Sequence, residues 1–159
     1  MKKFLSYDID VFKVADYILS KTDIDTEDYI SNLKLQKLLY YCQGFILAIT
    51  SKTLFTNNIL AWEHGPVIKE VYDKYKINGA MGIIPADPPS PDYYDCITKT
   101  ELKSIIDDVW DVYGQFSAWK LRNMTHEELP WKNTKRNQVI STNLLHKYFI
   151  TQIEDDKEN

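Results

Sequence analysis

The first half of the chain alternates apolar and polar residues with the spacing of amphipathic helices. Residues 8–21 carry apolar side chains three and four positions apart, which predicts a first helix with Asp8 or Asp10 as its N-cap. Residues 32–49 are predicted to form a second helix, with Ser31 as its N-cap. The apolar face of this second helix is too wide for a surface helix, so we expect it to be central and mostly buried.

One stripe of the second helix is polar and aromatic. Gln36, Tyr40 and Gln43 follow one another at spacings of four and three residues, which places them side by side on the helix. Gly44 lies in the interior of the same helix, where a glycine costs about 1 kcal/mol relative to alanine. We therefore expect Gly44 to allow the close approach of a neighbouring element.

An extended segment, residues 51–63, follows the second helix. Its two apolar stretches flank the turn-prone residues 56–58, which predicts a small β-hairpin. Gly65 and Pro66 are predicted to form a structural turn that ends this segment. Pro66 is then expected to open a third helix that continues to Tyr75.

Helices resume after a long interruption. Residues 76–95 contain two glycines and four prolines, which predicts a long irregular loop. The next helix is predicted to begin with a capping box formed by Thr98 and Glu101 and to end at Gly114. Ser117 is predicted to open a further helix.

The C-terminal part completes a mainly α fold. Thr125 and Glu128 form a second candidate capping box, residues 139–153 are predicted to form a last helix, and residues 154–159 a charged flexible tail. The sequence thus predicts a single compact helical domain, residues 1–153. A small β-hairpin lies between its second and third helices.

Charge restricts the class of partner. The net charge is −4 and the isoelectric point is about 5.4, so the chain lacks the positive footprint of a general nucleic-acid binder. We expect no direct nucleic-acid partner. A mildly acidic balance fits a basic protein partner, because complementary charge steers encounter.

The cysteines and the N-terminus indicate a compartment. Cys42 and Cys96 match no zinc or redox spacing, and two cysteines suit a reducing environment. The first ten residues lack the apolar stretch of a secretory signal, and no apolar run is long enough to span a bilayer. We therefore expect a cytoplasmic protein without a membrane partner.

The histidines are the main candidates for chemistry. His64, His126 and His146 show no pair four residues apart, so no metal site is predicted. His126 could act as a general acid–base or a metal ligand, but local packing on Trp131 explains its position more simply. Adjacent carboxylates on a helix point to different sides, so they make no acid–base dyad. No catalytic residue and no cofactor are predicted.

The junction around Gly65 admits two interpretations. In the first, Trp62 or His64 contacts a partner. In the second, Gly65 and Pro66 only shape a turn, and Trp62 packs in the core, which gives the turn a sufficient structural reason.

Four motifs closely resemble the Panacea antitoxin-domain family, whose members are also described as SocA-like or phage-associated proteins. They occur in the family's order and are KLQKLLYYCQGF, AWEHGPV, VYDKY and YGQFSAWKLRNMTHEELPW. The resemblance covers roughly residues 11–149. It implies a mainly helical antitoxin of a toxin–antitoxin pair, often found in prophage or defence regions.

The resemblance also implies a mode of action. Family members neutralise a protein toxin by direct stoichiometric contact, and the cognate toxin is expected to be encoded next door. One described member instead delivers its toxin to a protease, so a proteolytic adaptor is an alternative. A His-dependent hydrolase is a third hypothesis. No catalytic residue of the family carries over, so we expect a protein that is not an enzyme, and the oligomeric state stays open.

Aromatic side chains on the motifs are the candidate partner contacts. An interface of about 1,200–2,000 Å² typically depends on a few aromatic hot spots. We expect the exposed members of the following set to contact the toxin, together with the loop at residues 76–95: Tyr40, Tyr41, Trp62, His64, His126 and Trp131.

Overall fold

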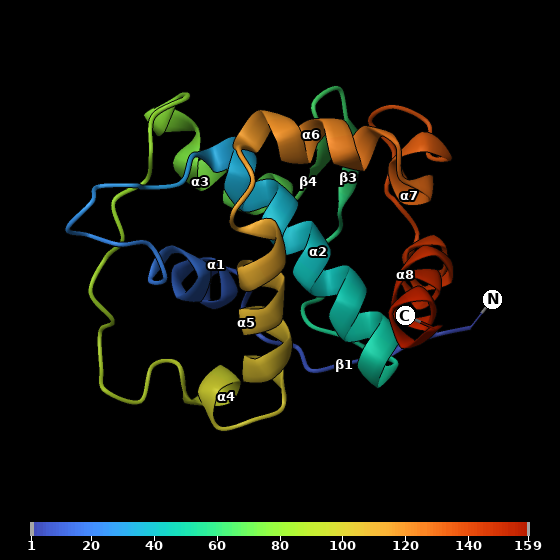
Figure 1. Ribbon diagram of the computed structural model, residues 1–159, viewed down its shortest axis with the longest axis horizontal. Helices are drawn as coiled ribbons and strands as arrows, with labels where there is room; N and C mark the ends of the chain where they lie inside the picture. The colour runs from blue at the N-terminus through green and yellow to red at the C-terminus, as the bar shows by residue number, and fades with distance from the viewer. Residues whose placement is uncertain (1, 159) are drawn as a thin grey trace.

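One long helix, α2 (Asn32–Thr50), organises the fold in a computed structural model that describes residues 2–158. The helices packed on it are α1 (Val11–Leu19), α5 (Leu102–Tyr113), α6 (Ala118–His126) and α8 (Thr142–Glu158). α2 runs diagonally through the middle of the molecule (Figure 1). The amide of Lys34 donates a 3.3 Å hydrogen bond to the Ser31 hydroxyl, which confirms the predicted N-cap. The predicted central position of this helix is confirmed as well.

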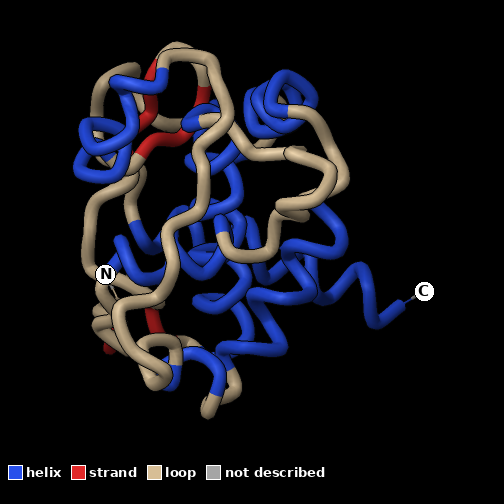
Figure 2. Tube along the Cα trace, turned by 90° about the vertical axis from the view of Figure 1, so that its left-hand side faces the viewer, coloured by secondary structure: helices blue, strands red, loops and turns tan. Residues whose placement is uncertain are grey.

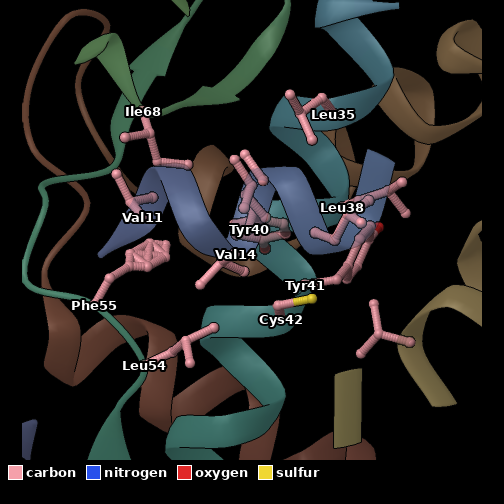
Figure 3. Close-up of a cluster of buried hydrophobic side chains, with 14 of the residues drawn as sticks. Val11, Val14, Leu35, Leu38, Tyr40, Tyr41, Cys42, Leu54, Phe55 and Ile68 are labelled. Carbon is pink, nitrogen blue, oxygen red and sulfur yellow. The ribbon is translucent and has the colours of Figure 1, made fainter. Parts of the chain in front are cut away.

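The N-cap of α1 and the role of Gly44 are also confirmed. The Asp10 carboxylate accepts a 2.9 Å hydrogen bond from the amide of Phe12. A Cβ atom at Gly44 would overlap the ring of Phe149 on α8, so only glycine lets these two helices approach so closely. Figure 3 shows the core that results, where Tyr40 and Tyr41 lie among aliphatic side chains.

Two small sheets accompany the helices. β1 (Leu5–Ser6) pairs with β2 (Lys52–Thr53) in parallel, a pairing that the sequence does not predict. β3 (Leu60–Trp62) and β4 (Gly65–Val67) form the antiparallel hairpin between the second and third helices. The existence of this hairpin was predicted, but the prediction of its turn at residues 56–58 was wrong.

The hairpin turns at Glu63 and His64, and Pro66 lies inside β4. Ala61, which faces Pro66, directs its amide to the Gln138 carbonyl and its carbonyl to the Asn137 amide. The pair therefore needs no N–H from Pro66, and proline fits there without breaking a ladder hydrogen bond.

Helix α3 (Lys69–Tyr75) consequently begins three residues after Pro66, so the prediction that Pro66 opens it was wrong. Residues 76–94 are mostly irregular, as predicted, apart from a short 3-10 turn, Lys76–Asn78. The Ile83 amide donates to the Ile30 carbonyl over 2.8 Å, so this loop lies against the one that precedes α2. Both loops lie on the flank that faces the viewer in Figure 2.

Both predicted capping boxes were wrong. Thr98 ends a short helix, α4 (Asp95–Thr98), and α5 begins at Leu102, where the Leu102 amide donates to the Thr100 hydroxyl. Thr125 lies in the last turn of α6, and its hydroxyl donates to the Arg122 carbonyl. Thr98 and Thr125 therefore lie at the C-terminal ends of α4 and α6. Neither residue precedes a helix in the position of an N-cap.

Two other predicted helix ends are confirmed, and the start of the last helix differs from the prediction. Gly114 ends α5 and the Ser117 hydroxyl caps α6, both as predicted. α8 begins at Thr142 and not at Val139, because Val139 pairs with β3. It continues to Glu158, into the stretch predicted to be a flexible tail, and that flexibility stays a prediction.

The described residues form one compact, mainly helical domain, as predicted. Asn159 and Met1 lie outside the described residues. Within residues 2–158, no helix has both the length and the apolar character that a membrane crossing needs.

Candidate functional site

The polar stripe of α2 is internal and supports the hairpin. The Gln43 amide oxygen accepts hydrogen bonds from the amides of Leu54 (2.7 Å) and Phe55 (3.3 Å), and its nitrogen donates to the Phe55 carbonyl. Gln36 accepts from the amide of Ile68 over 2.9 Å. The two glutamines thus hold the chain before and after the hairpin. Their role is to satisfy backbone groups that burial removes from water.

Tyr40 and Tyr41 are also internal, with exposed fractions of 0%. Their hydroxyls donate to the two carboxylate oxygens of Glu128, over 3.0 Å and 2.8 Å. Glu128 precedes α7 (Leu129–Lys132), so these bonds join α7 to α2. Only the exposed members of the candidate set were expected to contact the toxin, so Tyr40 and Tyr41 drop out of that set. A buried hydroxyl needs an acceptor, and Glu128 supplies one.

The Glu128 carboxyl is an unusual acid. Burial raises its pKa to about 7, although the hydroxyls of Tyr41, Tyr40 and Tyr148 stabilise the ionised form. Because Tyr148 lies on α8, the carboxyl connects three helices. Tyr113 stacks on the ring of Tyr41 with centroids 3.9 Å apart, which closes the cluster toward α5.

A buried lysine lies beneath the hairpin. Lys37 is 0% exposed, and its ammonium donates to the Pro66 carbonyl over 3.1 Å. Burial, with the nearby charge of Arg122, lowers the pKa of Lys37 to about 7. A Cβ atom on Gly65 would lie 2.7 Å from Lys37 Cε and 2.8 Å from Thr125 Oγ1. With a φ of +107° as well, this position requires glycine.

The other four candidate residues gather at the hairpin. The Trp131 indole donates to the Trp62 carbonyl over 2.7 Å, which joins α7 to β3. His126 stacks on Trp131 with centroids 3.8 Å apart and planes 6° apart. Burial and the positive charge of Arg122 lower the pKa of His126. The packing interpretation of His126 is therefore the one that the geometry supports, whereas His64 is exposed at the turn.

Three residues of this surface were not among the sequence candidates. Trp119 on α6 is 56% exposed, and the Arg122 guanidinium lies 4.4 Å from its ring centroid. Arg122 Nε also donates to His64 Nδ1 over 3.2 Å. Arg136 lies 3.5 Å from the centroid of Trp131. The three-residue spacing of Trp119 and Arg122 was a usable signal, because such pairs meet on a helix.

We call this surface the hairpin face. It comprises Trp62, His64, Trp119, Arg122, Trp131 and Arg136. It lies where α6, α7, β3 and β4 come together at the top of the view in Figure 1. A groove of about 520 Å³ adjoins it, and Trp62 and His64 are among the residues that line it. Lys76, Gly79 and Ala80 line the groove as well, so the predicted contact loop at residues 76–95 borders it too.

The chemistry available here is that of binding. Arg122 and Arg136 present guanidinium groups stacked on tryptophan rings, an arrangement that suits carboxylates and aromatic surfaces. Among the described side chains, those of residues 2–154, no group of three or more His, Cys, Asp or Glu is placed to hold a metal ion.

Comparison with known proteins places these elements in a family. The family model described as Antitoxin SocA-like, Panacea domain, matches residues 35–132, which run from α2 through α7. Antitoxin SocA of Caulobacter vibrioides (strain NA1000 / CB15N) is 39% identical over 79 residues, which cover 48% of this chain. The matched part spans only 40% of that relative's length. No solved structure matches the chain.

Proposed function

This chain belongs to the family of SocA-like antitoxins with the Panacea domain, and on that premise we propose that it neutralises a protein toxin by direct stoichiometric binding. Family membership supports the antitoxin role. The hairpin face is the surface that we propose for the contact. One observation carries this choice: exposed Trp119 and His64 lie there beside half-buried tryptophan and arginine side chains, on short, internally braced elements.

The bracing matters for affinity. Trp131 is held by its hydrogen bond to Trp62, and Arg136 by a 2.7 Å bond to the Trp131 carbonyl. Side chains ordered before binding lose less conformational entropy in the complex. The complex would cover the active or substrate-binding surface of the toxin, with about 1,200–2,000 Å² buried in total. This mode of action needs no cofactor and no catalytic step, and it would operate in the cytoplasm.

The apolar loop beside the groove extends the proposed contact. Ile77 and Met81 are 91% and 76% exposed. These residues can add apolar area to an interface whose centre is the hairpin face. The loop would then adjust the choice of toxin, while the hairpin face supplies the main contacts.

Co-expression with the product of the neighbouring gene tests the proposal. If that product alone stops growth, we expect the wild-type chain to restore growth and to co-elute with it in size-exclusion chromatography. The double variant Trp119→Ala/Arg122→Ala should lose both effects. The control Ile49→Ala removes an apolar side chain whose exposure, 52%, is similar to that of Trp119. Ile49 lies at the C-terminal end of α2 and outside the hairpin face, so this variant should keep both effects.

Other outcomes point to the other mechanisms. Restored growth with protease-dependent loss of the toxin would support a proteolytic adaptor. A folded His64→Asn variant that binds the toxin yet fails to restore growth would support a hydrolase. Absence of any toxic neighbour and any complex would contradict the proposed function.

A further inference from the structure

Residues 117–138, which supply four of the six residues of the hairpin face, are positively charged in an acidic chain. The whole sequence has 23 acidic and 19 basic residues, but residues 117–138 contain five lysines and arginines and two glutamates. One of those glutamates, Glu128, is enclosed by tyrosine hydroxyls beneath α7. The local charge is thus opposite in sign to that of the chain as a whole.

The two arginines of the sequence, Arg122 and Arg136, both lie on this face. The ion pairs found among residues 2–154, whose side chains are described, all use lysine, so neither arginine is paired with a carboxylate of that part of the chain. The acceptors of Arg122 are neutral: His64 Nδ1 at 3.2 Å and the Asn123 amide oxygen at 2.9 Å. Its positive charge is therefore uncompensated within the described part of the chain.

Two other basic groups lie close to Arg122. Buried Lys37 and half-buried His126 both lie near enough for its charge to lower their pKa values. Arg122 therefore carries most of the positive charge of this group at neutral pH, because a lowered pKa leaves His126 mostly neutral and Lys37 only partly charged. An anionic group from a partner would offset the charge of Arg122, and a guanidinium can bind a carboxylate through two parallel hydrogen bonds.

We propose that the hairpin face binds an acidic segment of the toxin, and that Arg122 receives one of its carboxylates beside the ring of Trp119. This inference rests on the proposed function, because it names the chemistry of the same partner. An apolar side chain next to the carboxylate would contact the exposed Trp119 ring. The contact thus pairs charge selection with apolar burial.

The surroundings favour a protein segment over a nucleic acid. Exposed Glu63 and Glu127 flank the face, and the Glu127 side chain is 81% exposed. A polyanion with a phosphate at every step would meet these carboxylates, since nucleic-acid binding neutralises many phosphates along a strand. A discrete carboxylate can fit between them.

Charge reversal on the purified chain tests the inference. We would measure the affinity of the neighbouring gene product, as a catalytically inactive variant, for wild type, Arg122→Lys, Arg122→Gln and Arg122→Glu. We expect a roughly 100-fold loss for Arg122→Glu and a smaller loss for Arg122→Lys, which keeps the charge but not the planar fork. The control Lys99→Glu makes the same charge change between α4 and α5, far from α6 in Figure 1, and should have little effect.

Two further measurements complete the test. Wild-type affinity should fall as salt rises from about 50 mM to about 500 mM, and the affinity of Arg122→Glu should change less. A reciprocal acid-to-lysine scan of the toxin should find one position that restores binding to Arg122→Glu. Thermal unfolding confirms that each variant is folded, and Arg122→Gln serves where the reversal disturbs α6.

The failures are distinguishable. If wild type binds the toxin and folded Arg122→Glu binds it equally well, the acidic contact is wrong, while direct neutralisation stands. If wild type binds no neighbouring product, the proposed function itself fails. If a duplex DNA of about two helical turns binds wild type and not Arg122→Glu, the anion is a phosphate, which also overturns the inference.

Discussion

Two aromatic regions of this molecule, the tyrosine cluster around Glu128 and the hairpin face, differ in how their charges are partnered. In the cluster, the Tyr40 and Tyr41 hydroxyls donate to the buried carboxylate. At the hairpin face, Arg122 lies on an exposed ring, and its acceptors among the described side chains are neutral. Both regions consist mainly of motif residues. The difference teaches that a shared motif can hold residues that build the scaffold beside residues that face outward.

The division has a physical cause. A buried polar group without a partner costs about 1–3 kcal/mol, so interior tyrosines need an internal acceptor. A guanidinium in contact with water stays hydrated, so its charge needs no carboxylate partner until the toxin binds. We therefore expect changes in the interior to act on stability, and changes on the hairpin face to act on binding.

The largest expected effect is that of Gly44→Val in the interior. The new side chain would overlap the Phe149 ring, so the free energy of unfolding should fall by about 3 kcal/mol. Urea denaturation followed by circular dichroism measures this. The control Ile49→Val, on the exposed side of the same helix, should change it by less than about 0.5 kcal/mol. Equal stabilities would mean that α8 does not pack closely on α2.

Glu128→Gln should change the pH dependence of stability. The pKa of Glu128 is raised from 4.5 to about 7 in the fold, so its contribution is present below pH 4.5 and is lost as pH rises through 7. Between about pH 5 and pH 7, this loss amounts to about 2 kcal/mol.

Denaturation of both proteins across that pH range isolates the effect. Burial lowers the pKa values of His126 and His146, which act in the opposite direction below pH 6.5. The difference between wild type and Glu128→Gln cancels these terms. A difference that stays constant with pH would show that Glu128 is not the titrating group.

Lys37→Met should remove a rise in the free energy of unfolding with pH, which is opposite in sign to the fall caused by Glu128. The pKa of Lys37 is lowered from 10.5 to about 7, so the cost of burying the ammonium declines as pH rises from 7 toward 10.5. Wild type should therefore gain about 1.5 kcal/mol from this group between about pH 7 and pH 8.5, and the variant should not. The same denaturation series tests it below the range where the Cys42 thiol contributes. Parallel curves for the two proteins would contradict the assignment.

The smallest expected effect on stability belongs to Trp119→Ala on the hairpin face. Because the ring is 56% exposed, the free energy of unfolding should change by less than about 0.5 kcal/mol. Toxin affinity should nevertheless fall by about 30-fold, as for a hot-spot residue. Calorimetric titration and thermal melts on one preparation separate the two quantities. A large stability loss with unchanged affinity would erase the distinction between the two regions.

Local signals in the sequence determined much of the scaffold. Ser31, Ser117 and Gly114 mark helix ends because each acts through atoms within a few residues of itself. The wide apolar face of α2 and the position of Gly44 predicted a buried helix with a close neighbour. The presence of a hairpin between the second and third helices was likewise predictable.

The tertiary structure alone decided where the hairpin turns and which aromatic residues are exposed. Pro66 lies in a strand because Ala61 directs its hydrogen bonds to residues 137 and 138, far along the chain. Tyr41 can be internal because the fold brings it an acceptor, Glu128, from 87 positions along the chain. The contact between His64 and Arg122 likewise joins residues 58 positions apart. Periodicity and capping describe energies between near neighbours in the sequence. Burial and partner choice depend on contacts between distant residues, which only the packed fold brings together.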